Sequence, residues 1–136
     1  MIRNLSLIKA KLLAHLNAVD GLTVAYGYEK GQLPSYPAAT IYSAEYNPVW
    51  ADTSGDRDVI TFEIRIYQEI NIQDPETAET IVDNVLEKIV QALQADYTLG
   101  GTCDRIEIRA TKGWVSREVQ DRAATITVIT EKMNRI

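Results

Sequence analysis

The strongest constraint on the fold is the alternation of apolar and polar side chains over residues 60–67, within the segment DVITFEIRIYQE (58–69). The apolar positions are Ile60, Phe62, Ile64 and Ile66, and the positions between and after them are Thr61, Glu63, Arg65 and Tyr67. Because successive side chains of a strand point to opposite faces of its sheet, this pattern predicts a strand with one buried face and one wet face. Such a sheet is typical of antiparallel pairing.

Four further segments have the composition of strands. They cover residues 22–28, 37–46, 103–113 and a segment that begins near Arg117. The last one contains ATITVITEK, whose β-branched residues favour a place in the interior of the sheet. Residues 47–57, with the sequence NPVWADTSGDR, contain Pro48 and Ser54-Gly55 and predict a long hairpin loop.

Two amphipathic helices are predicted, over residues 3–18 and 75–95. In the first, Leu5, Ile8, Leu12 and Leu16 recur three or four residues apart. The second begins with Asp74 as N-cap and Pro75 at the first helical position. Its apolar stripe is Ala78, Ile81, Val82, Val85, Ile89 and Leu93, and Gly100-Gly101 follows as a break.

The predicted order is therefore α-β-β-β-α-β-β. Each helix has one apolar stripe to bury, and the half-apolar sheet is the surface available for it. We expect an α+β fold: a two-layer sandwich with a mainly antiparallel sheet of about 4–5 strands and both helices packed on one face. No linker or repeat divides the chain, so residues 1–136 are expected to form a single domain.

The residues that usually carry catalysis or hold metals are scarce. Cys103 is the only cysteine, which excludes an intrachain disulfide and a Cys-based zinc site. His15 is the only histidine, and no carboxylate, Ser or Cys lies within one helical turn of it to form a relay. Gly100-Gly101 follows a helix instead of preceding one, so it offers no phosphate cradle. We therefore expect no enzymatic activity, no cofactor and no metal.

The charge is unevenly distributed. The whole chain carries −5, but residues 45–96 carry −9, while residues 1–44 and 97–136 each carry +2. An acidic chain argues against nucleic-acid binding, which depends on cationic contacts to phosphates. The asymmetry predicts either an acidic and a basic face, as in self-assembling subunits, or simply a solvated acidic helix. No apolar run approaches the ~20 residues that span a bilayer, so no membrane association is expected.

The best sequence pointers to a binding surface are two tryptophans in the predicted connecting regions. A Trp in a polar loop either packs back onto the body of the protein or is exposed for a partner. The candidate interface residues are Trp50, Asp52, Asp56 and Arg57 from the first region, and Lys112, Trp114 and Arg117 from the second.

The succession of these segments resembles the tail terminator (tail-completion) proteins of long-tailed phages, the family of the lambda terminator. The matching pieces are the N-terminal helix, the strand YPAATIYSAEY, the loop NPVWADTSGDR, the strand VITFEIRIYQE, the helix PETAETIVDNVLEKIVQAL and the final pair of strands, which ends in RAATITVITEK. The resemblance spans nearly the whole chain, but the family has no motif residues to carry over.

The resemblance implies a structural virion protein that forms a ring, expected to be a hexamer, at the head-proximal end of the tail. It would end polymerisation of the tail tube protein and offer a docking face to the head–tail connector protein, after assembly in the host cytoplasm. The alternatives are a neck or head-completion subunit and, from other classes, a small enzyme or a ligand-binding module of α+β fold.

Overall fold

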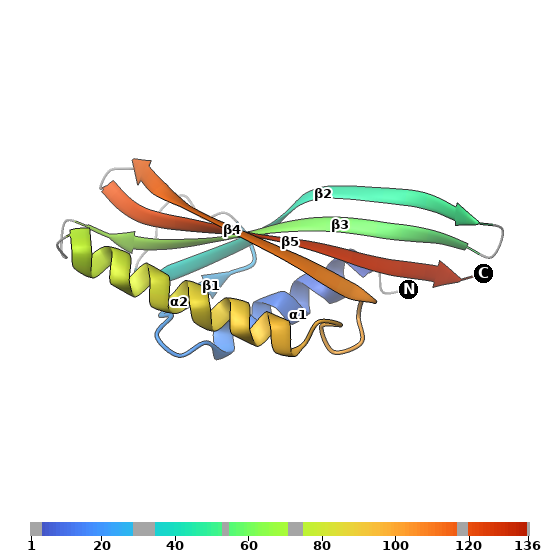
Figure 1. Ribbon diagram of the computed structural model, residues 1–136, viewed down its shortest axis with the longest axis horizontal. Helices are drawn as coiled ribbons and strands as arrows, with labels where there is room; N and C mark the ends of the chain where they lie inside the picture. Colours follow the sequence, from blue (N-terminus) through green and yellow to red (C-terminus); the bar gives the residue numbers. More distant parts are fainter. Residues whose placement is uncertain (1–3, 29–34, 53–54, 71–74, 117–119, 136) are drawn as a thin grey trace.

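The computed structural model describes residues 4–28, 35–52, 55–70, 75–116 and 120–135. The elements in chain order are α1 (Asn4–Ala18), β1 (Val24–Tyr26), β2 (Ala38–Asp52), β3 (Gly55–Glu69), α2 (Pro75–Ala95), β4 (Arg105–Ser116) and β5 (Gln120–Arg135) (Figure 1). The predicted order of helices and strands is confirmed, as is the α+β class.

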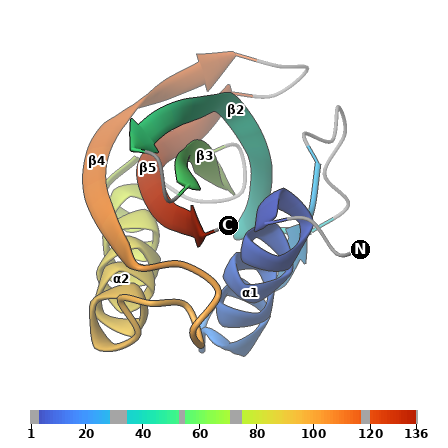
Figure 2. The ribbon, with the colours of Figure 1, turned by 90° about the vertical axis from the view of Figure 1, so that its right-hand side faces the viewer.

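In the described part of the chain, five strands form one sheet in the order β1-β2-β3-β5-β4. β1 pairs with β2 in parallel, and the other three pairings are antiparallel. β5 lies between β3 and β4, which confirms the interior position predicted from its β-branched residues. The two helices lie on the same face of this sheet (Figures 1 and 2).

The core lies between the helices and the sheet face that they cover. The four apolar residues of the alternating strand are fully buried there, together with Ile8, Leu12 and Leu16 of α1 and Val82, Val85, Ile89 and Leu93 of α2. Tyr67 departs from the predicted alternation, because it is buried although it belongs to the opposite face. Its cross-strand partners there are Ala38 and Ala123, which are themselves buried.

The prediction of a long loop over residues 47–57 is wrong. β2 continues to Asp52 and β3 begins at Gly55, with pairs such as Asn47 with Val59 and Trp50 with Asp56. Residues 53 and 54 lie outside the described residues. We call residues 47–52, 55–59 and 131–135 the β arm; it extends past the ends of both helices (Figure 1).

The position of the β arm explains why its sequence is misleading. With no helix covering it, neither face requires apolar side chains, so the alternation that marks a strand is missing. Pro48 is also compatible with β2, because a strand at the side of a sheet has N–H groups that need no ladder partner. Polar composition here reflects the lack of an apolar buried face, since even the buried Asp58 is polar, while the backbone remains paired.

The connection from α2 to β4 is a true break, as predicted from its glycines. Leu99, Gly100 and Gly101 have φ angles of 49°, 67° and 84°, in the left-handed region. Glycine adopts this conformation without steric cost, whereas Leu99 does so with its side chain fully buried in the core. Burial of Leu99 therefore fixes this connection against the body of the protein.

Candidate interaction surfaces

The predicted interface residues lie in strands, not in loops. Trp50 and Asp52 belong to β2, Asp56 and Arg57 to β3, and Lys112 and Trp114 to β4. The placement of both tryptophans in connecting segments is therefore corrected. Arg117 lies outside the described residues, as do the side chains of Trp50, Asp52, Asp56 and Trp114.

The structure separates these residues into two groups. The first group lies in the β arm, where Gly55 pairs with Arg135. The second lies at the other end of the sheet, where Ser116 pairs with Gln120 and Glu69 with Asp121 (Figure 1). The 15 residues of β3 run from one end to the other, a span of roughly 50 Å. The sequence prediction thus describes two distant surfaces and not one patch.

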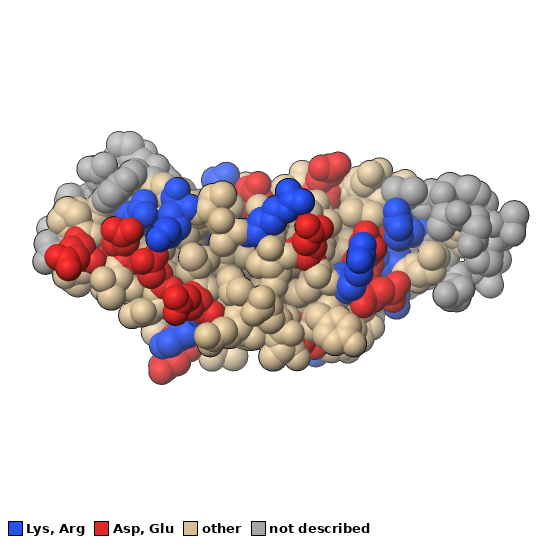
Figure 3. Space-filling view, in the orientation of Figure 1, with Lys and Arg blue, Asp and Glu red and all other residues tan. Residues whose placement is uncertain are grey.

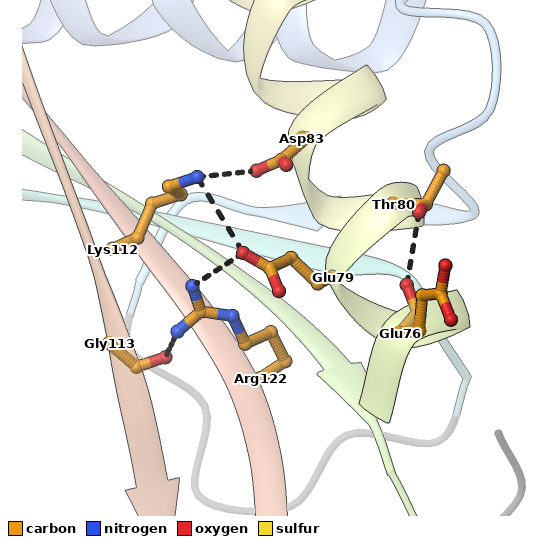
Figure 4. A network of polar contacts seen from close by, with 7 residues as sticks. All are labelled: Glu76, Glu79, Thr80, Asp83, Lys112, Gly113 and Arg122. Atoms are coloured by element: carbon orange, nitrogen blue, oxygen red, sulfur yellow. Dashed lines mark hydrogen bonds and ion pairs between the residues drawn. The ribbon is translucent and has the colours of Figure 1, made fainter. Parts of the chain in front are cut away.

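In the second group, Lys112 is held by partners within the chain. Its Nζ atom lies 3.1 Å from Oδ1 of Asp83 and 3.9 Å from Oε1 of Glu79 (Figure 4). Arg122, which is only 7% exposed, places Nη2 3.5 Å from the same Glu79 oxygen. Its Nη1 donates to the carbonyl oxygen of Gly113 at 2.6 Å. This network fixes the end of the β4–β5 hairpin to α2.

Ion pairs of the same kind follow β4 toward its start. Arg105 Nε donates to Oε2 of Glu131 at 2.9 Å, and this hydrogen bond lowers the pKa of Glu131. Arg109 pairs with Glu107 at 3.2 Å, and both side chains are mostly exposed. Figure 3 shows acidic and basic side chains interleaved over this side of the molecule. The pairs of Lys112 and Arg122 with Glu79 and Asp83 join the acidic middle of the sequence to its basic end, so these charges neutralise each other in part within the chain.

His15 has a carboxylate partner that the sequence pattern did not reveal. Its Nε2 lies 2.8 Å from Oδ2 of Asp96, which is 81 positions away in the chain. The other oxygen of Asp96 accepts the N–H of Gly100 at 2.9 Å. The hydrogen bond from Gly100 and then that from His15 lower the pKa of Asp96. The pair ties α1 to the α2–β4 connection.

The geometry of the remaining nucleophile candidate does not favour reactivity. Cys103 is 3% exposed, and burial raises the pKa of its thiol to about 11. A thiol with such a pKa is almost entirely protonated at neutral pH, whereas the thiolate is the reactive form. Within the described residues, no three His, Cys, Asp or Glu side chains gather as metal ligands would.

The sheet face opposite the helices carries a third group, which is not among the predicted interface residues. Tyr42 donates a hydrogen bond to Glu63, and the guanidinium of Arg65 lies 5.2 Å from the centre of the Tyr42 ring. Beside them is a hollow of about 290 Å³, lined by Arg65, Tyr67, Thr111, Lys112, Gly113, Ala123 and Thr125. A positioned Tyr–Arg pair next to a hollow is the type of anchor found at protein interfaces. The sequence did indicate that Tyr42 and Arg65 lie in strands with one solvent-exposed face, which was the available sign of this group.

Comparison with known proteins gives no further assignment: neither a protein-family model nor a curated protein matches the chain. Of the helices in the described ranges, neither combines the length and the apolar character needed to cross a membrane.

Proposed function

We propose that the protein is a structural component of a phage virion that caps the tail tube as a ring. In this role it ends polymerisation of the tube protein and provides the face on which the head connector docks. The ring is expected to be a hexamer, assembled in the host cytoplasm and located at the head-proximal end of the tail. The first support is the element order α-β-β-β-α-β-β, which is the order on which the family resemblance rests.

The observation that carries the proposal is the separation of the two candidate contact groups. One lies in the β arm and the other at the β4–β5 hairpin, at opposite ends of the sheet (Figure 1). A ring between a tube and a connector must bind a different partner on each of its two sides. A subunit with contact surfaces at both ends of its long axis meets this requirement.

The chemistry of the described residues supports a non-enzymatic role. The carboxylate of Asp96 is engaged by both a backbone amide and His15, so it is committed to holding a loop. The thiol of Cys103 is buried, and its raised pKa keeps it protonated. The interleaved ion pairs along β4 likewise favour protein contacts over an anionic polymer such as nucleic acid.

The test is a capping assay with the tail tube protein of the same phage. Growing tubes are mixed with the protein, and their lengths are measured by negative-stain electron microscopy. Capping predicts shorter tubes with one extra ring of density at one end, and a light-scattering mass of several subunits for the free or tube-bound protein. A chain that stays strictly monomeric and never associates with tubes contradicts the proposal. Binding to portal complexes instead of tubes supports the neck role.

A further inference from the structure

We infer that neighbouring copies of this chain join edge to edge, with β4 of one copy pairing against β2 of the next. The inference rests on the proposed ring, and it names the surfaces by which the ring would form. β2 and β4 are the outermost antiparallel strands of the sheet. Both carry backbone groups on their outer sides that other strands can pair with.

Both edges are accessible along most of their length. β1 covers only three residues of β2, Ala38–Thr40. Beyond it, residues 44–48 are exposed, and in β4 the exposed residues are 105, 107 and 109–112. Among the described strands, none pairs with the outer side of β4 or with the remainder of β2. A second copy would therefore meet no obstacle from these strands at either edge.

The directions of the strands suit a closed ring. Three antiparallel steps separate β2 from β4, so the two strands run in opposite directions. A rotation about an axis roughly parallel to the strands thus places β2 of the next copy antiparallel to β4. All helices then remain on the same side of the continuous sheet. Because the two surfaces differ, the contact is head-to-tail and generates a ring when the rotation closes.

Charge selects this pairing over the two like-edge pairings. β2 contains Glu45 and Asp52 and no basic residue, for a net charge of −2. β4 contains Arg105, Arg109 and Lys112 with one acid, Glu107; Lys112 is held by α2, which leaves a net charge of +1 on the face opposite the helices. Pairing β2 with β2 or β4 with β4 would bring like charges together, whereas β2 with β4 brings opposite charges together.

The charged side chains also lie on a shared face. Across the sheet, Glu45 pairs with Thr61, Thr61 with Ile129, and Ile129 with Glu107, so Glu45 and Glu107 lie on the same face, the one opposite the helices. Arg105 and Arg109 lie two positions from Glu107 in β4 and therefore belong to that face as well. In the continuous sheet these side chains would lie on one face of the seam, our name for the contact between β4 of one copy and β2 of the next. The Arg109–Glu107 pair is 70% and 61% exposed, so exchanging it for a contact with a neighbour costs little.

Two features of β2 make a single seam weak. Pro48 lacks an N–H donor, and the register with β3 shifts between Ser43 and Glu45. Such irregularities discourage uncontrolled pairing at sheet edges. In a closed ring, every copy is held at both edges at once, which raises the effective concentration at each seam. Assembly is then favoured only where copies are already gathered, as on the end of a tube.

The first test is a charge swap across the seam, read out by native mass spectrometry and by ring formation on tube ends. Glu45→Lys and Arg109→Glu should each weaken ring assembly about tenfold, and the double variant should recover most of it. Glu87→Lys on the exposed side of α2 makes the same charge change away from both edges and should have no effect. Circular dichroism of each variant confirms that it is folded.

The second test is disulfide trapping. Glu45→Cys is combined in one chain with Arg105→Cys, Glu107→Cys or Arg109→Cys, because paired strands bring Cα atoms within the ~7 Å that a disulfide allows. One of these combinations should give a ladder of cross-linked species that ends at the ring, while each variant with only one introduced cysteine should give no ladder, because the natural Cys103 is buried.

The outcomes separate the two proposals. If wild-type rings cap tubes but neither the swap nor the trapping affects or links them, the edge pairing is overturned and the capping role stands. Dimers from a variant with only one introduced cysteine would show like-edge pairing and also overturn it. If the wild-type protein neither forms rings nor binds tubes, the capping role fails, and the edge pairing falls with it.

Discussion

Two connections in this chain look alike in sequence but differ in structure: residues 47–57, between the main parts of β2 and β3, and residues 96–104, between α2 and β4. Both are polar and contain glycine. The first is mostly a paired ladder, and the second is a compact turn with a buried leucine. The difference lies in what fixes each segment. Backbone pairing holds the β arm, whereas a core side chain and an aspartate hold the α2–β4 connection.

The largest expected effect comes from removing the core anchor of the α2–β4 connection. Leu99→Ala deletes a fully buried side chain and should lower the free energy of unfolding by roughly 2–5 kcal/mol in urea titrations. Val59→Ala, at a half-buried position of the β arm, is the matched control and should cost about 1 kcal/mol or less. Equal costs at the two positions would remove the distinction between the connections.

The next effect concerns the left-handed backbone that follows Leu99. Gly100→Ala should cost roughly 1–2 kcal/mol, because a Cβ at φ +67° is strained; Cε of the exposed Lys11, 2.9 Å from that Cβ, belongs to a flexible side chain that can move aside. Gly101→Ala has φ +84° but no atom within 4 Å of its Cβ, so only the backbone strain of about 1 kcal/mol remains. Thermal unfolding should therefore show both variants destabilised by similar amounts, and an unchanged midpoint for either would contradict the left-handed strain.

A smaller effect is expected at the carboxylate that ties this connection to α1. Since the pKa of Asp96 is lowered below its ordinary 3.8, its ionised form stabilises the fold above that pH, and the stabilisation disappears as the pH falls through the lowered value. Asp96→Asn should cost about 1 kcal/mol at pH 7, limited by partial solvent exposure. The difference from wild type should shrink in urea titrations toward pH 3. A difference that stays constant with pH would contradict this account.

The smallest effect is expected in the β arm. Tyr46→Phe removes a 3.1 Å hydrogen bond to Asp58 from a side chain that is half exposed. The free energy of unfolding should fall by about 0.5–1 kcal/mol, because the backbone ladder remains. Hydrogen exchange of residues 57–60 should remain slow in this variant. Rapid exchange there would indicate that side chains, and not pairing, hold the β arm.

Sequence reasoning succeeded where a segment has one buried face. The alternation of residues 60–67 and the stripe of α2 both arise from packing against the same core, so they predicted the elements and their layers. It failed in the β arm, because strands without a buried face leave no periodic signal. The pattern of the sequence thus records burial more directly than it records backbone pairing.

The candidate sites were less predictable for a related reason. The contact between His15 and Asp96 joins positions 81 residues apart, and the Tyr42–Glu63–Arg65 group depends on the register of two strands. Neither the separation nor the register can be read from local spacing. The tryptophans and the loop charges indicated the two ends of the molecule, but not that these ends lie far apart.

The buried Cys103 has a practical consequence for labelling. Burial raises the pKa of this thiol to about 11, so it is almost entirely protonated at pH 7, and the side chain is almost inaccessible to reagents. A maleimide dye added to the native protein would thus leave Cys103 unmodified over ordinary reaction times. A single cysteine introduced on the surface can then carry a fluorophore at a defined position without replacing the natural one. Fluorophores placed in this way would allow distance measurements between the copies of the proposed ring.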